Sequence, residues 1–135
     1  MTTWITTHGI GAIKDSKSTF EITVENGSGV VRPTTATDLR GWVHFTIPGP
    51  PVDKPVLKIA QIDFSSQSAS VETMQLYLAN RRVFDEGQLQ KTSSFDLDIS
   101  SSKAIYQDKG IALSLELVFN NVGGALRFQS VGIQV

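Results

Sequence analysis

The chain has 135 residues, of which 40% are hydrophobic and 19% are charged. This length suits one domain over residues 1–135, and the composition is that of a folded protein rather than a disordered one. With 12 basic and 13 acidic residues the net charge is −1, which gives no electrostatic reason to expect nucleic acid as a partner.

The first residues lack the features of an export signal. Residues 1–8 have neither the basic segment nor the apolar core of a secretory signal, and we predict a first strand over residues 4–8. No run approaches the ~20 apolar residues that cross a bilayer, so we expect no membrane insertion. The default expectation is a cytoplasmic protein, with export by a signal-independent route left open.

Alternation of apolar residues then predicts a series of strands. Residues 9–18 are predicted as a loop. Residues 19–25 form the next strand, and the following Asn26-Gly27 is a strong signal for a tight hairpin turn. A short strand over residues 29–32 is expected to pair back on it, and residues 41–47 form the next strand. The apolar residues of that strand share one face: Val43, Phe45 and Ile47.

Four prolines between positions 48 and 55 end this strand, because proline donates no backbone hydrogen bond to a neighbouring strand. The strands expected beyond them are residues 56–65, 71–78, 83–86, 92–100, 111–120 and 126–135. Ile59 and Ile62 lie an odd number of residues apart, which indicates a bulge or burial on both faces. The last two strands are predicted to form a hairpin through residues 121–124.

The stretch from Ile111 to Phe119 shows the strand pattern most clearly, because every second residue is large and apolar. Regular short strands separated by Gly, Pro and Asn turns are typical of an antiparallel sandwich or barrel. We therefore predict an all-β fold, a jelly-roll-like antiparallel β-sandwich of about eight or nine strands.

One segment resembles a known group of proteins. Residues 42–50 are similar to the pattern Trp-x-His-x-x-Ile-Pro-x-Pro of a family of small, uncharacterised bacterial β-rich proteins. The matching positions are Trp42, His44, Ile47, Pro48 and Pro50. Thr46 stands where that family usually has proline. The resemblance implies a β-rich fold and no particular activity.

Trp42, His44 and Thr46 share the strand face opposite the apolar residues, and Arg40 precedes them on that face. A flat aromatic ring beside polar groups suits sugar binding. The ring covers the apolar face of a pyranose while polar side chains bind its hydroxyl groups. These residues are therefore candidate ligand-binding residues.

The first strand repeats this pattern with Trp4 and His8, which are further candidates. If the two strands were neighbours, they would present one wider surface of Trp and His side chains. In the alternative interpretation, each Trp closes the gap between a strand and a covering loop, and each His makes one satisfied hydrogen bond.

No catalytic or metal site is predicted. Asp96 and Asp98 share one face and are weak candidates for a shared Ca²⁺, but their spacing matches no calcium-binding loop. The chain has no cysteine and only two histidines, too few for a histidine-based zinc site. Neither histidine comes with a nucleophile motif, so we expect no enzyme activity and no cofactor.

Two functions remain. The preferred one is a non-catalytic binding module with a glycan as its partner. The alternative is a structural or assembly subunit of a homo-oligomer or of a larger bacterial complex. In that case the apolar hairpin over residues 111–135 would be the edge that a partner buries. We prefer binding, because the polar and aromatic face is the one local feature that a folded core does not require.

Overall fold

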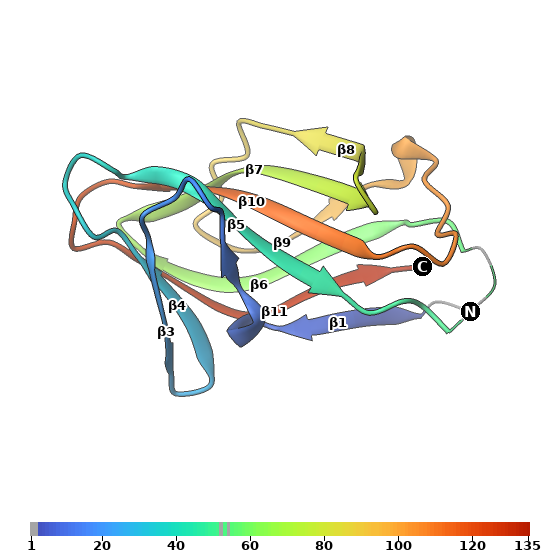
Figure 1. Cartoon of the computed structure of the whole chain (residues 1–135), viewed down its shortest axis with the longest axis horizontal. Coiled ribbons are helices and arrows are strands. Elements are labelled where there is room, and N and C mark those ends of the chain that lie inside the picture. The colour runs from blue at the N-terminus through green and yellow to red at the C-terminus, as the bar shows by residue number, and fades with distance from the viewer. Residues whose placement is uncertain (1–2, 52, 54) are drawn as a thin grey trace.

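The computed structural model describes residues 3–51, 53 and 55–135. Two antiparallel β-sheets pack face to face along the length of the molecule (Figure 1). Eleven strands and two short 3-10 helices form in this part of the chain, and no helix in it is long and apolar enough to cross a membrane. Met1 and Thr2, on which the prediction about an export signal partly rests, lie outside the described residues.

Sheet A consists, in spatial order, of β3 (Glu21–Glu25), β4 (Ser28–Arg32), β11 (Ala125–Gln134), β6 (Ile59–Gln67) and β9 (Ser93–Asp98). β1 (Trp4–His8) pairs with the C-terminal half of β11. Sheet B has the order β2 (Ile13–Lys14), β5 (Arg40–Ile47), β10 (Ile111–Phe119), β7 (Ala69–Leu78) and β8 (Arg81–Glu86). The 3-10 helices are η1 (Gly9–Gly11) and η2 (Ser100–Ser102).

The predicted fold class is confirmed. From β4 onward, all but one of the connections between successive strands cross from one sheet to the other, which is the path of a jelly roll. The strands are more numerous than predicted, in part because β2 forms where a loop was expected. β2 is short and lies at the edge of sheet B, so apolar alternation could not reveal it.

β10 and β11 do not form the predicted hairpin. β10 lies between β5 and β7 in sheet B, whereas β11 pairs with β4, β1 and β6 in sheet A. The turn at residues 120–124 instead carries the chain across the sandwich. Because both strands have partners on both sides, the apolar edge expected to drive assembly is not there. Apolar alternation identifies the buried face of a strand but not its neighbours.

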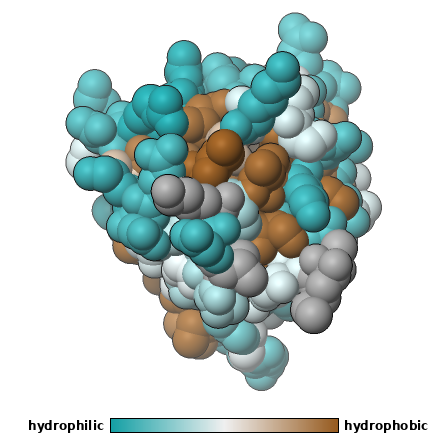
Figure 2. Space-filling model, turned by 90° about the vertical axis from the view of Figure 1, so that its right-hand side faces the viewer, coloured by the Kyte–Doolittle hydropathy of each residue, from teal (hydrophilic) through white to brown (hydrophobic). Residues whose placement is uncertain are grey.

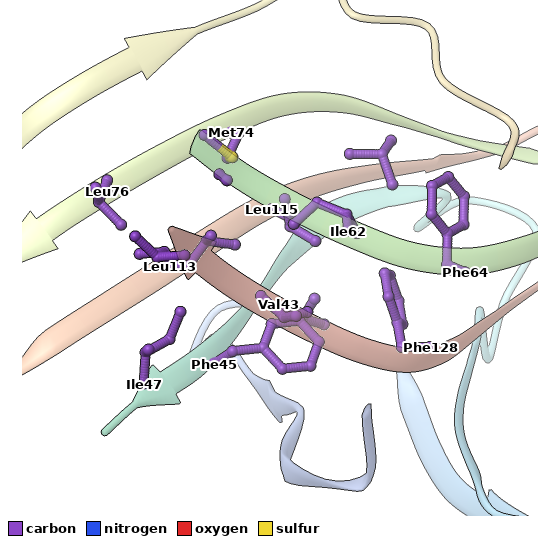
Figure 3. Packing of buried hydrophobic residues seen from close by; sticks show 14 of the residues in the cluster. Val43, Phe45, Ile47, Ile62, Phe64, Met74, Leu76, Leu113, Leu115 and Phe128 are labelled. Atoms are coloured by element: carbon purple, nitrogen blue, oxygen red, sulfur yellow. The ribbon is translucent and has the colours of Figure 1, made fainter. Parts of the chain in front are cut away.

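The core fills the space between the two sheets (Figure 3). Every second residue of β10 from Ile111 to Phe119 is at most 2% exposed, so the alternation seen in the sequence marks the core face. Phe45 of β5 meets Phe128 of β11 edge to face, with ring centroids 5.4 Å apart. Burial of each such side chain contributes about 1.5–3 kcal/mol, so the two sheets stabilise each other.

The irregularity predicted near Ile59 and Ile62 is present, although not for the expected reason. The register of β6 against β9 shifts after Ile62. Ile62 points into the core, whereas Ile59 is half-buried on the outer face of sheet A. The odd spacing therefore reflects one outward-facing isoleucine, and the bulge lies further along the strand.

Candidate functional site

β5 presents the predicted polar and aromatic residues on the outer face of sheet B. Arg40 and Thr46 are exposed and Trp42 and His44 are half-buried, while the residues between them are buried. Strand alternation produces this arrangement, because the apolar residues of β5 belong to the core. The predicted orientation of these four side chains is confirmed.

Strand pairing adds residues from β10 and β7 to the same face. In register, His44 lies opposite Ser114 and Ser114 opposite Gln75. These three residues form a row across the sheet, and a parallel row of residues lies on each side of it. We call the whole surface the sheet B platform; it consists of Arg40, Trp42, His44, Thr46, Thr73, Gln75, Tyr77, Ala112, Ser114 and Glu116. Sequence analysis found only the part contributed by β5.

His44 is held between two partners on the platform. Its Nδ1 atom lies 2.7 Å from Ser114 Oγ, and its Nε2 atom lies 2.9 Å from Asp15 Oδ1. A carboxylate only accepts hydrogen bonds, so Nε2–H donates to Asp15, while Nδ1 and the Ser114 hydroxyl share the second hydrogen bond. The hydrogen bond from His44 lowers the pKa of Asp15 below its usual value of 3.8. The ring orientation is thus fixed from both sides.

These three residue types also make up the serine hydrolase triad, but this arrangement does not suit nucleophilic catalysis. Ser114 is only 2% exposed and lies in the middle of β10, the central strand of the sheet. A nucleophile must reach the reacting atom of a substrate. The Ser114 hydroxyl is covered, so its role here is to orient the imidazole of His44.

Other polar groups of the platform are also fixed by hydrogen bonds. Thr73 Oγ1 donates to Glu116 Oε1 at 2.8 Å, and the other Glu116 oxygen lies 3.5 Å from the Arg40 guanidinium. Tyr77 OH donates to Gln75 Oε1 at 3.0 Å. These contacts hold donors and acceptors in place before any ligand arrives, which reduces the entropic cost of binding.

β2 explains how Asp15 reaches the platform. Ile13 and Lys14 pair with β5, and Asp15 N donates to Trp42 O at 3.0 Å. The segment is therefore tied along β5, and the Asp15 carboxylate meets His44 at the edge of the sheet. Asp15 lies in a region predicted as a loop, so the sequence offered no signal for this contact.

Trp4 and His8 do not join the platform. Their strand, β1, pairs with β11 in sheet A, and their side chains are exposed on the outer face of that sheet. His8 Nδ1 accepts a hydrogen bond from Ile10 N and so caps η1. The wider surface of Trp and His side chains that the sequence suggested does not form, because the two strands belong to opposite sheets.

Asp96 and Asp98 also lie on sheet A. They line a cleft of about 470 Å³ together with residues of β6 and β11. Asp98 Oδ1 accepts hydrogen bonds from the amide and the hydroxyl of Ser100, and these lower its pKa below the usual 3.8. Within the part of the chain that the structure describes, no three His, Asp or Glu side chains gather as metal ligands would. Asp98 is occupied as a local cap.

The platform residues that sequence analysis missed are Thr73, Gln75, Tyr77, Ala112, Ser114 and Glu116, and it also missed Asp15, which contacts His44 from the edge of the sheet. Ser114 and Glu116 could have been noticed as polar residues within the otherwise apolar stretch from Ile111 to Phe119. Their proximity to Trp42 and His44 depends on strand order, which no local pattern contains.

Solved structures share this fold at low sequence identity. A low-affinity xylan-binding module from Roseburia intestinalis is 9% identical, with a TM-score of 0.63 over 97% of this chain and 94% of that one. A family 29 carbohydrate-binding module is also 9% identical, with a TM-score of 0.52 over 99% and 89%. The insecticidal crystal protein Cry2Aa is 12% identical, with a TM-score of 0.54 over 97% of this chain and 21% of its own.

No protein-family model matches the sequence, and no curated protein matches it. The resemblance of residues 42–50 to the small bacterial β-rich family therefore stays a prediction. At these identities the structural comparisons establish one point. The chain has the β-sandwich fold that carbohydrate-binding modules also have.

Proposed function

We propose that this chain is a non-catalytic glycan-binding module and that the sheet B platform is its binding surface. One observation carries the proposal: two aromatic residues, Trp42 and Tyr77, are half-buried on the same outer face, among polar side chains that hydrogen bonds already orient. Aromatic rings bind the apolar face of a sugar, and oriented polar groups bind its hydroxyls.

The centre of the platform is formed by smaller side chains. β10 lies between the strands of Trp42 and Tyr77, and it contributes Ala112 and Ser114 at the outer face. A ligand can therefore lie across β10 and contact both rings. A sugar chain has apolar ring faces and hydroxyl groups along its edges. Its faces can pack on the two aromatic rings while its hydroxyls bind the polar groups beside them.

The spacing of the two aromatic residues favours a chain of sugars over a single sugar. Trp42 lies opposite Glu116, and Tyr77 lies opposite Ala112. The two residues are thus two strands and four positions apart, and strand geometry makes that a diagonal of roughly 17 Å. A glycan that contacts both rings has to extend over several sugar units.

The comparisons support the proposal through the fold. The xylan-binding module has the same architecture over nearly the whole of both chains. Because unrelated functions recur on one fold, the platform residues carry the proposal, and the shared fold only agrees with it.

The proposal is tested by measuring glycan binding for the wild type, Trp42→Ala and Tyr77→Ala on one glycan array, followed by titration calorimetry. We expect selective binding that each variant weakens about ten-fold or more, because each loses a large contact surface. Trp4→Ala is the matched control, since Trp4 is 39% exposed on the opposite sheet.

Thermal unfolding should show that all variants are folded. Binding that is lost in Trp4→Ala and retained in Trp42→Ala would contradict the assignment to sheet B. An array without any binding by the folded wild type would contradict the proposed function itself.

A further inference from the structure

A groove lies between the start of β8 and the segment of residues 102–109. It consists of two adjoining hollows of about 340 and 280 Å³, which share Arg81, Ile105 and Gln107. The first also includes the turn after β7 and Lys109, and the second includes Arg82 and Lys103. Both lie at the end of the sandwich that faces the viewer in Figure 2.

The charged residues that line the groove are all basic. They are Arg81, Arg82, Lys103 and Lys109, and no described Asp or Glu lines either hollow. Arg82 has an ion pair with Asp85 at 3.7 Å. Among the described residues, the other three cations have no ion-pair partner. The groove therefore has an excess of positive charge that the fold does not neutralise.

Backbone hydrogen bonds hold both walls of the groove in place. On one side Leu57 N donates to Ala104 O, and Tyr106 N donates to Pro55 O, each at 3.0 Å. On the other side Ala79 N donates to Gly110 O at 2.7 Å, which ties the turn after β7 to the segment before β10. The walls are thus fixed against the sandwich, and a ligand does not have to order them.

Lys103 is held in a backbone conformation that non-glycine residues seldom adopt. Its φ is 55°, and it ends η2 in the left-handed region. Ser102 secures the segment, since its hydroxyl donates to Ile99 O at 2.7 Å and accepts from Ala104 N at 3.1 Å. The side chain that lines the groove therefore comes from a rigid position.

The surface around the groove is part apolar. Figure 2 shows a hydrophobic centre at this end of the molecule with hydrophilic side chains around it. Ile105, a lining residue of both hollows, is 39% exposed, and Val56, which bridges to it, is 41% exposed. Charges beside apolar surface are less screened by water, which strengthens their attraction for an anion.

One lining residue of the groove, Arg82, adjoins the platform. Arg82 lies directly opposite Tyr77 in the pairing of β8 with β7. A glycan that contacts Tyr77 can therefore reach Arg82 on the next strand, and with it the basic lining of the groove. Guanidinium groups bind carboxylate and sulfate through paired hydrogen bonds.

We propose that this groove binds the carboxylate or sulfate groups of an acidic glycan, an inference that rests on the glycan-binding function proposed above. The ligand class follows from the lining: four cations, three of which have no ion-pair partner among the described residues, fixed walls, and a lining residue, Arg82, that pairs with Tyr77 of the platform.

The test compares binding to glycans that differ only in charge. The probes are a xylan that carries glucuronic acid, the same xylan with its carboxyl groups reduced, chondroitin sulfate and chemically desulfated chondroitin. The groove variant is the double substitution Arg81→Gln and Lys103→Gln. The control is Lys17→Gln with Lys58→Gln, which removes the same charge from exposed residues that line neither hollow.

We expect the wild type to prefer the more highly charged form of at least one pair of glycans. The groove variant should bind that form about ten-fold more weakly and lose the preference, while the control variant keeps it. Added salt should weaken the charged interaction selectively. The carboxylate and sulfate arms identify which anionic group is preferred.

Three patterns separate the inference from the function on which it rests. Equal binding of the two members of each pair, unchanged in the groove variant, would overturn the inference and leave the glycan-binding proposal in place. Binding that the groove variant loses, but Trp42→Ala and Tyr77→Ala retain, would support the groove and contradict the platform. Absence of binding to every probe by the folded wild type would overturn both.

Discussion

Glu25 illustrates what one side chain contributes at the residue scale. The Arg32 guanidinium donates to both of its carboxylate oxygens, at 2.6 and 3.2 Å, and Thr23 donates to one of them at 2.8 Å. The hydrogen bonds from Arg32 are the main reason why the pKa of Glu25 falls to about 2 from its usual 4.5. The ionised carboxylate therefore stabilises the folded state.

This lowered pKa predicts how stability depends on pH. A carboxylate whose pKa is lower in the folded state stabilises it fully above pH 4.5, and that contribution is lost as the pH falls toward about 2. Glu25→Gln should therefore be less stable than the wild type at pH 6, with a difference that shrinks below pH 4.5 and disappears near pH 2.

Urea unfolding at a series of pH values measures this difference. Glu86→Gln is the control for the loss of one acidic charge, because Glu86 has no ion pair among the described residues. A constant difference between the wild type and Glu25→Gln from pH 6 to pH 2 would contradict the assigned role of Arg32.

At the scale of elements, the β3–β4 hairpin shows a local sequence signal that decides a structure. Asn26 and Gly27 have φ values of 50° and 76°, so the predicted tight turn is confirmed. Positive φ at both central residues matches the twist of the two strands, and Asn and Gly are the residues that tolerate it. Figure 1 shows the hairpin projecting from the body of the sandwich.

A pair of glycine substitutions isolates the backbone effect at this turn. Neither Gly27 nor Gly110 has an atom within 4 Å of an added Cβ, but only Gly27 has a positive φ. Gly27→Ala should lower the free energy of unfolding by about 1–2 kcal/mol, whereas Gly110→Ala should be neutral or slightly stabilising. Denaturant unfolding of both variants makes the comparison, and equal effects would contradict the φ explanation.

At the scale of the whole molecule, the core couples the two sheets. Leu115 is fully buried at the centre of sheet B and packs within the same cluster as residues of sheet A. Leu115→Ala should lower the free energy of unfolding by about 2–5 kcal/mol, because it leaves a cavity between the sheets. Val24→Ala, at a side chain that is 63% exposed, should change it by about 0.5 kcal/mol or less.

Urea unfolding followed by circular dichroism and by fluorescence tests this coupling. If the sheets form one cooperative unit, both signals should change together in the wild type and in Leu115→Ala. Separate transitions for the two signals would show that the sheets unfold independently.

The candidate site combines these scales. His44 was predicted as an outward-facing residue from the alternation of β5, and the structure confirms that orientation. Its partners Ser114 and Asp15 are 70 and 29 positions away in the chain. No local pattern indicates such contacts, because they depend on which strands become neighbours. The same reason explains why Trp4, with the same local pattern, lies on the opposite sheet.

The sequence by itself determined the all-β class, the buried face of strands such as β5 and β10, and the Asn26-Gly27 turn. These features follow from residues near one another in the chain, since side-chain alternation and backbone preference are local properties. Only the tertiary structure decided that β10 and β11 belong to different sheets, that Tyr77 joins Trp42, and that Arg81 and Lys103 share a groove. Those arrangements depend on strand pairing and sheet packing. The same strands could be combined in many ways, and burial of the whole core selects one of these combinations.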